Sequence, residues 1–156
     1  MLQQEENAMS PLLGTWLVVS VNQNSETTVT SSSSSTTYST TAVGSDLNHT
    51  ITFTGEPNEA VGEGLYSLEM TFTETDDNSS TSSTYFSAGH ILLGSFATWN
   101  YEGDTLSLDL GGKIVNAEVL NLTTTELLIE ISSQDTQTLN GVTTVTSDSI
   151  IYEFLK

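Results

Sequence analysis

The dipeptide Asn140-Gly141 constrains this chain more than any other feature, because it predicts a β-hairpin of defined register. A type I′ turn needs positive φ at both central residues, and Asn and Gly tolerate that conformation. With the turn placed there, the alternation of side chains brings the apolar residues of both arms onto one face. We therefore predict one long hairpin over residues 126–156, whose apolar face needs a cover. Its expected opposed pairs are Leu139 with Val142, Ile131 with Ile150, Ile129 with Tyr152 and Leu127 with Phe154.

The rest of the chain contains shorter segments with the alternating or β-branched pattern of strands. They cover residues 12–22, 47–54, 65–74, 95–101, 104–110 and the segment around 115–118. Two-residue turns at Glu102-Gly103 and Gly111-Gly112 join the later strands, and a bulge is expected in the link 122–125. The expected pairs are Phe53 with Tyr66, Ile51 with Leu68, Trp99 with Leu106, Ala97 with Leu108, Leu108 with Val115 and Leu106 with Ala117.

Two long stretches separate these strands, and the first lacks the apolar content of a folded segment. Residues 24–46 are a Ser/Thr run with Tyr38 alone, and residues 76–94 begin acidic and Ser-rich before a more apolar second half. Low-complexity polar segments cannot bury enough surface to order themselves. We predict a mobile loop over 24–46, with an ordered lid or adhesive tract as the alternative, and a second long loop over 76–94 whose second half is apolar enough to pack onto another part of the chain.

No segment has sustained helical periodicity, and the pattern predicts eight consecutive antiparallel strands with one apolar face each. Such strands close most economically into an up-and-down barrel, because closure removes the two edges that would template aggregation. The sequence therefore predicts an all-β fold, an eight-stranded antiparallel barrel, with a sandwich as the alternative. We expect a polar tail over residues 1–11 and a single domain over 12–156, long enough to bury a core. The interior of such a barrel is filled by side chains or holds one small ligand.

Three short motifs resemble the lipocalin-like (calycin) domains of exported bacterial lipoproteins. The first strand opens with Leu-Gly-Thr-Trp at 13–16, which is similar to the Gly-X-Trp signature of lipocalins. The run Trp-Asn-Tyr-Glu-Gly-Asp-Thr-Leu-Ser-Leu at 99–108 and the ending Ile-Tyr-Glu-Phe-Leu-Lys look like those domains as well. The resemblance implies that Trp16 points into the closed end of the barrel. Lipocalins stack an Arg on this Trp, and since the chain has no Arg, Lys156 would have to replace it.

Charge excludes several classes of partner. The formal net charge is -18, from 20 acidic residues against 2 basic ones, Lys113 and Lys156. Binding to nucleic-acid phosphates depends on Lys and Arg, so this balance excludes it and also argues against docking on anionic lipid headgroups. No stretch approaches the roughly 20 apolar residues of a membrane-spanning helix. The Ser/Thr/Asn-rich composition predicts an exported protein, periplasmic or at the cell surface, and a removed upstream segment is the expected place for a lipid anchor.

Alternate loops of an up-and-down barrel lie at the same end, so the two long loops share one rim, and long loops on a rigid scaffold mark a binding mouth. The inward positions below this rim form a mostly apolar lining that suits a small apolar or amphipathic ligand. The predicted ligand-binding residues are His49, Met70, Phe72, Leu110, Val115 and Ile131, with His90 at the mouth. For His49, a hydrogen bond to a loop is the alternative. The predicted barrel floor, a structural plug of buried side chains, is Trp16, Phe53, Tyr66, Trp99, Tyr152 and Phe154.

Neither His lies in a nucleophile-elbow context and the carboxylates of the strands fall on outward positions, so we predict no catalytic residue, metal site or cofactor. Two functional classes remain. The first is a non-enzymatic lipocalin-like protein that binds a small apolar ligand inside the barrel, which needs a cavity of roughly 300 Å3 or more. The second is a surface interaction module with a packed interior that contacts a protein, a glycan or calcium through its long acidic and Ser/Thr-rich loops.

Overall fold

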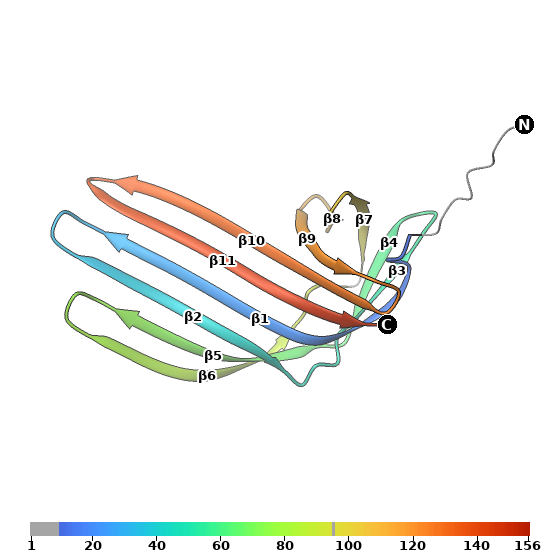
Figure 1. Cartoon of the computed structure of the whole chain (residues 1–156), viewed down its shortest axis with the longest axis horizontal. Helices are drawn as coiled ribbons and strands as arrows, with labels where there is room; N and C mark the ends of the chain where they lie inside the picture. The colour runs from blue at the N-terminus through green and yellow to red at the C-terminus, as the bar shows by residue number, and fades with distance from the viewer. Residues whose placement is uncertain (1–9, 95) are drawn as a thin grey trace, which may run out of the picture.

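The computed structural model describes residues 10–94 and 96–156. Its helices and strands in these residues are β-strands only (Figure 1). Residues 1–9 of the expected N-terminal tail and Ser95 of the expected strand 95–101 lie outside the described residues. The strands are β1 (Gly14–Thr30), β2 (Ser35–Ser45), β3 (Thr50–Thr54), β4 (Glu59–Glu63), β5 (Tyr66–Thr75), β6 (Ser80–His90), β7 (Ala97–Glu102), β8 (Thr105–Asp109), β9 (Ile114–Leu122), β10 (Glu126–Leu139) and β11 (Val142–Leu155).

Eight of these strands close into a barrel, in the order β1, β3, β4, β7, β8, β9, β10 and β11, and the pairing of β11 with β1 completes the circle. All neighbouring strands are antiparallel, and each barrel strand lies beside the next barrel strand along the chain. The predicted all-β, eight-stranded, antiparallel up-and-down barrel is therefore confirmed. Its member strands differ in part from those predicted.

The remaining strands extend one side of the barrel wall. β1, β10 and β11 continue beyond the barrel, and β2, β5 and β6 add to them in the order β10-β11-β1-β2-β5-β6, which we call the projecting sheet. Figure 1 shows three long hairpins side by side with the barrel at their base. The predicted mobile loop over 24–46 and the predicted long loop over 76–94 are therefore wrong, because most of each stretch belongs to strands. A polar segment forms a strand when its backbone N–H and C=O groups bond to those of a neighbouring strand. The spacing of apolar residues does not predict such pairing.

The predicted hairpin between residues 47–54 and 65–74 is also wrong. β3 pairs instead with β4, while β5 pairs with β2 and β6 in the projecting sheet. β4 lies in the Gly- and Glu-rich stretch between the predicted strands 47–54 and 65–74, where low β-propensity gave no strand signal. Gly62 suits this part of the wall, since a Cβ there would lie 2.0 Å from the carbonyl oxygen of Leu93. The observed pairs are Phe53 with Ala60 and Ile51 with Gly62.

The C-terminal hairpin has the predicted register throughout. Asn140 and Gly141 have φ of 52° and 79°, the positive values that a type I′ turn needs. In the adjoining β9–β10 pairing a register shift occurs between Leu128 and Ile129, rather than in the predicted link 122–125. The confirmed pairs are Leu139 with Val142, Ile131 with Ile150, Ile129 with Tyr152 and Leu127 with Phe154, and, across the Gly111-Gly112 turn, Leu108 with Val115 and Leu106 with Ala117.

The β7–β8 register differs from the prediction by two residues, because Trp99 lies opposite Leu108 rather than Leu106. The turn therefore begins at Gly103, whose φ is 59°. The predicted turn would have put Glu102 at the first central position, where tight hairpin turns require positive φ and glycine is preferred.

Large apolar side chains pack the barrel interior, and all six residues of the predicted floor are buried among them. Trp16 Nε1 donates to the Leu12 carbonyl oxygen at 2.7 Å, and Trp99 Nε1 donates to the Thr54 carbonyl oxygen at 2.9 Å, so burial leaves neither donor unsatisfied. Burying each such side chain stabilises the fold by about 1.5–3 kcal/mol. The same core includes Val18, Val21, Ile51, Leu93, Leu106, Leu108, Val119, Leu127 and Ile129.

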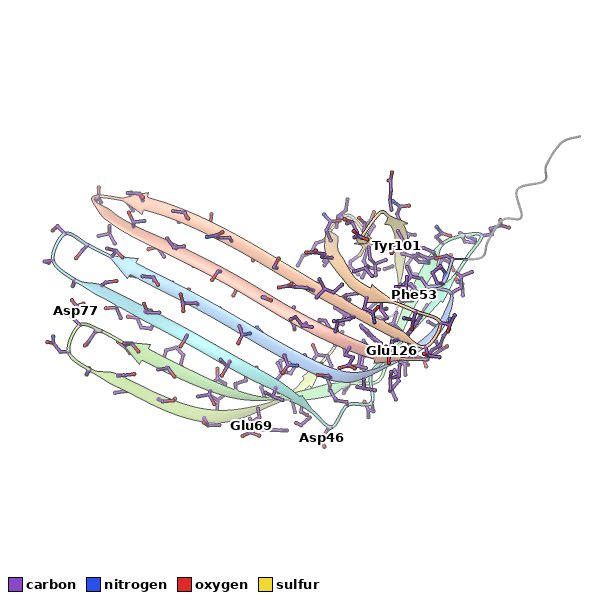
Figure 2. The ribbon with its side chains drawn as sticks, viewed as in Figure 1. Asp46, Phe53, Glu69, Asp77, Tyr101 and Glu126 are labelled. Carbon is purple, nitrogen blue, oxygen red and sulfur yellow. The ribbon has the colours of Figure 1, made fainter. Side chains whose placement is uncertain are left out.

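The projecting sheet, in contrast, is a single layer. All residues of β10 from Ser132 to Leu139 are exposed, and so are those of β6 from Ser80 to Phe86. Figure 2 shows short side chains along these strands and dense packing only at the barrel end. The projecting sheet therefore depends on its backbone ladders and cross-strand side-chain pairs rather than on a core.

Candidate functional site

His49, the polar residue predicted to face a ligand, lies between β2 and β3 and is fully buried. Its Nδ1 lies 3.1 Å from the Gly64 carbonyl oxygen, and the backbone nitrogen of Leu93 lies 3.4 Å from its Nε2. A carbonyl only accepts and a backbone N–H only donates, so the proton is on Nδ1 and the ring is neutral. Both ring nitrogens therefore bond to loop backbone, which was the alternative to a ligand contact.

Two tyrosines meet inside the barrel just below the projecting sheet. The hydroxyl of Tyr66 lies 2.9 Å from that of Tyr152, and Tyr152 lies opposite Val21, one residue before β1 begins to pair with β2. His90 stacks on Tyr66 with ring centroids 5.7 Å apart, and its Nε2 lies 2.9 Å from Ser87 Oγ. Burial raises the pKa of both phenols, and the contact with Tyr66 raises the pKa of Tyr152 further. The pair therefore lies at the end of the barrel core that adjoins the projecting sheet.

Four of the other predicted ligand residues lie far apart along the sheet order. Met70 and Phe72 are on β5 in the projecting sheet, where Phe72 stacks on Tyr38 with ring centroids 6.3 Å apart. Leu110 follows β8, and Val115 lies on β9. β5 is not one of the eight strands of the closed barrel, whereas β8 and β9 are, and of the four residues Met70 and Leu110 pack against the core.

Ile131 is the predicted ligand residue that lines a pocket. It lies opposite Ile150, and the two line a pocket of about 150 Å3 together with Gln23 and Asp148. None of the other predicted ligand residues lines this pocket. The structure thus does not gather the predicted set at one site.

One face of the projecting sheet carries a regular array of hydroxyl groups, and we call it the hydroxyl face. Residues that face the same way lie in rows across neighbouring strands, about 4.8 Å apart between strands and about 7 Å apart along a strand. Four rows show the array, with Asn24, Glu26, Gln134 and Val145 as its exceptions. The rows are Thr138, Thr143, Thr30, Ser35; Thr136, Val145, Thr28, Thr37, Thr75, Ser80; Gln134, Ser147, Glu26, Ser39, Thr73, Ser82; and Ser132, Ser149, Asn24, Thr41, Thr71, Thr84.

Cross-strand hydrogen bonds hold many of these hydroxyls in place. Because a hydroxyl donates once and accepts twice, each bonded pair keeps a donor and further lone pairs for an external group. The face is therefore preorganised for hydrogen bonding. The bonded pairs, with oxygens between 3.1 and 3.3 Å apart, are Thr28 with Thr37, Thr30 with Ser35, Thr71 with Thr84, Thr73 with Ser82, Thr75 with Ser80 and Thr138 with Thr143.

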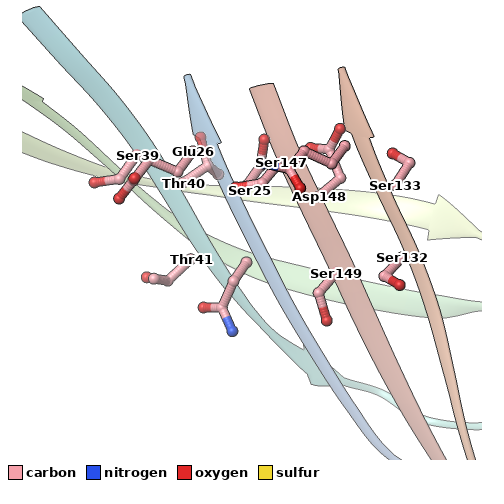
Figure 3. A pocket seen from close by; sticks show the side chains of 12 residues that line it. Ser25, Glu26, Ser39, Thr40, Thr41, Ser132, Ser133, Ser147, Asp148 and Ser149 are labelled. Atoms are coloured by element: carbon pink, nitrogen blue, oxygen red, sulfur yellow. The ribbon is translucent and has the colours of Figure 1, made fainter. Parts of the chain in front are cut away.

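The rows of the hydroxyl face nearest the barrel border an open hollow of about 700 Å3 that spans β2, β1, β11 and β10 (Figure 3). Ligand sites have volumes of roughly 300–1,000 Å3, so the hollow is large enough for a small ligand. Every residue that lines it is polar. The lining residues are Asn24, Ser25, Glu26, Ser39, Thr40, Thr41, Ser132, Ser133, Gln134, Ser147, Asp148 and Ser149.

The residues that line the hollow include two acidic residues and no lysine or arginine. Glu26 belongs to the hydroxyl face, whereas Asp148 lies opposite Ser25 and therefore points to the other face. The two carboxylates do not face each other as the acid and base of a glycosidase do. The arrangement can donate and accept hydrogen bonds, and it offers an anionic ligand no cation.

Within residues 10–94 and 96–156, no group of three or more His, Cys, Asp or Glu side chains is placed to hold a metal ion. In the same part of the chain, no helix is long and apolar enough to cross a membrane. Comparison with known proteins finds no matching family model, no matching curated protein and no matching solved structure.

Sequence reasoning missed the hydroxyl face, although part of its signal is visible. Thr71 and Thr73 alternate with other residues in the predicted strand 65–74, which puts two hydroxyls on one side, and Thr75 continues the alternation in the observed strand. In the Ser/Thr run of residues 24–46, by contrast, almost every position is polar, so no alternation distinguishes a strand from a disordered tract.

Proposed function

We propose that this protein is a non-enzymatic binding module that holds an uncharged, hydroxyl-rich ligand, such as a segment of a glycan chain, on its hydroxyl face. The observation that carries this proposal is the hollow of about 700 Å3 with an entirely polar lining. Sugar hydroxyls donate and accept hydrogen bonds, as the Ser and Thr lining does. The packed barrel then acts as the rigid base from which the binding surface projects.

The charge of the chain favours a neutral ligand over an anionic one. The net charge is -18, and the lining of the hollow contains carboxylates but no cation. An anionic polysaccharide would be repelled at long range and would find no counter-charge on contact. We therefore expect neutral glycans to bind and polyanionic ones to fail.

Binding to a panel of neutral and anionic polysaccharides, followed by calorimetry, tests the proposal. Ser147→Tyr places a ring in the hollow, and Thr146→Tyr is the matched control because residue 146 is the next on β11 and faces the other side. We expect Ser147→Tyr to weaken binding by about tenfold or more, equal to about 1.4 kcal/mol, and Thr146→Tyr to leave it unchanged. The proposal fails if no neutral glycan binds, or if both variants bind as the unmodified protein does.

A second candidate is the small apolar ligand expected from the sequence. The observation in its favour is the pocket of about 150 Å3 next to Ile131 and Ile150. This volume is below the roughly 300 Å3 of ordinary ligand sites, so only a very small molecule would enter. Ile131→Glu should abolish such binding, whereas Ser147→Tyr should not affect it, and this contrast separates the two candidates.

We also propose membership of the lipocalin-like domains and an exported location. Support for the family comes from Lys156, whose Nζ lies 4.8 Å from the centroid of the Trp16 ring, where the resemblance requires a cation.

Fractionation of the native host tests the exported location: recovery in the periplasmic or surface fraction supports it, and recovery in the cytosol contradicts it.

A further inference from the structure

β6 (Ser80–His90) is an open edge of the projecting sheet. It pairs with β5 on one side, and no described strand pairs with its other side. An exposed edge presents unpaired N–H and C=O groups, and proteins usually protect it with lysines, prolines, other charges or bulges. β6 contains no charged residue and no proline, and its irregularity is confined to the end near the barrel, where Gly89 has a φ of 82°.

The absence of charge on this edge is unusual for a chain with 20 acidic residues and a net charge of -18. The other free edge, the part of β10 beyond Glu130, carries Asp135. Two copies of the chain repel each other at long range, so they associate best where no acidic side chains are brought together. The edge of β6 is such a place.

We propose that β6 pairs with β6 of a second copy of this chain, antiparallel and about a two-fold axis, so that two projecting sheets become one. Full pairing of residues 80–88, up to the positive-φ Gly89, places Thr84 opposite Thr84 of the second copy. Tyr85 then lies opposite Ser83 of the second copy, and Phe86 lies opposite Ser82. Tyr85 and Phe86 are 49% and 60% exposed in the single chain, and the pairing covers one on each face of the sheet.

The two-fold arrangement agrees with the shape and the charge distribution of the chain. In each copy the barrel lies at one end of the projecting sheet (Figure 1). Because the two β6 strands run in opposite directions, the two barrels lie at opposite ends of the joined sheet. The acidic β5–β6 turn, with Asp76 and Asp77, lies at the end of each sheet away from its own barrel. The two acidic turns are therefore at opposite ends of the seam. A closed two-fold pair is also the commonest homo-oligomer.

This register continues the hydroxyl face across the seam, because residues directly opposite each other share a face. Thr84 belongs to that face, so its row continues into the Thr84 row of the second copy, whereas the row that ends at Ser82 meets Phe86. The pair would present two hollows on one surface, and bivalent attachment to a polymer raises the apparent affinity without a new contact. This gain in affinity rests on the proposed function, whereas the pairing of the chains does not.

Sedimentation across a concentration series at low and high salt tests the pairing. A seam between two single strands is small, so we expect a mass that rises with concentration from 16.7 kDa towards twice that value, and more readily in high salt. Thr84→Glu puts two carboxylates opposite each other and should keep the chain monomeric. Thr136→Glu, which adds the same charge to the other free edge, should still pair. A constant mass of 16.7 kDa under all these conditions, or pairing by Thr84→Glu equal to that of Thr136→Glu, would overturn the proposal.

The chain has no cysteine, so a single introduced cysteine reports the register. Thr84→Cys places two thiols opposite each other at the two-fold axis, where Cβ atoms are about 4.5–5.5 Å apart, close enough for a disulfide after small adjustments. Thr136→Cys on β10 is the matched control. We expect mild oxidation to cross-link Thr84→Cys and not Thr136→Cys. Equal cross-linking of both variants, or of neither, contradicts the pairing. Glycan binding by the unmodified protein, measured at a concentration at which it is monomeric, separates failure of the pairing from failure of the proposed function.

Discussion

The ammonium group of Lys156 lies over the ring of Trp16, with Nζ 4.8 Å from the ring centroid. The same nitrogen donates to the carbonyl oxygens of Pro11 and Leu13 just before β1 begins. The last residue of the chain thus joins the start of the first barrel strand. Gly14 leaves room for this contact, because a Cβ there would lie 2.6 Å from Lys156 Cε.

Lys156→Met should destabilise the protein, because it keeps most of the aliphatic stem but removes the cation–π contact and the two hydrogen bonds. We expect the free energy of unfolding in urea to fall by about 1–2 kcal/mol. Lys113→Met is the matched control, since Lys113 is exposed near the β8–β9 turn and its change should stay within about 0.5 kcal/mol. Equal effects of the two substitutions would show that Lys156 acts only through net charge.

Gly14→Ala should destabilise the protein by about 1–3 kcal/mol, because its φ of 118° is strained for a residue with a Cβ and the methyl group displaces Lys156. Gly112→Ala is the control for backbone strain alone, since Gly112 has φ of 101° but a Cβ at this position would have no other atom within 4 Å. In a double-mutant cycle with Lys156→Met, the decreases in the free energy of unfolding of the two single variants should sum to more than the decrease in the double variant. Strict additivity would mean that Gly14 does not act through Lys156.

Tyr152→Phe should change how stability depends on alkaline pH. Burial raises the pKa of Tyr66 and Tyr152 above the ordinary 10.0, so above about pH 10 the unfolded chain releases protons that the native protein retains. The stabilisation is therefore complete below pH 10 and declines as pH rises towards the native pKa values. Tyr152→Phe should lose about 1 kcal/mol near neutrality and show a shallower decline above pH 10 in urea melts. Tyr85→Phe, exposed on β6, is the control, and an equal slope for all three proteins would contradict the assignment.

Hydrogen exchange should separate the barrel from the projecting sheet. Both faces of the projecting sheet are open to solvent, so its amides should exchange through local openings that cost less than global unfolding. We expect amides of β6 and of the β10–β11 turn to exchange faster than those near the buried Leu127 and Phe154. Mass spectrometry of peptides from the two regions measures this difference. Uniform protection would show that the projecting sheet unfolds only together with the barrel.

The candidate site was only partly predictable from the amino-acid pattern. The alternation in β10 and β11 correctly paired Ile131 with Ile150, which line the small pocket. Of the strands that carry the hydroxyl face, β2, β6 and the later part of β1 were expected to be loops. Their Ser and Thr residues have the same polarity on both faces, so periodicity contains no information about pairing or direction.

Local residue chemistry alone specified the C-terminal hairpin, because the Asn140-Gly141 turn and the alternating apolar residues act between neighbours. It also specified an all-β barrel, because the apolar faces have to be buried together. Only the tertiary structure determines that β3 pairs with β4 and that β5 and β6 belong to the projecting sheet rather than to the barrel. Those choices depend on contacts between distant segments, such as the close approach of Gly62 to the Leu93 carbonyl oxygen, which no local pattern records.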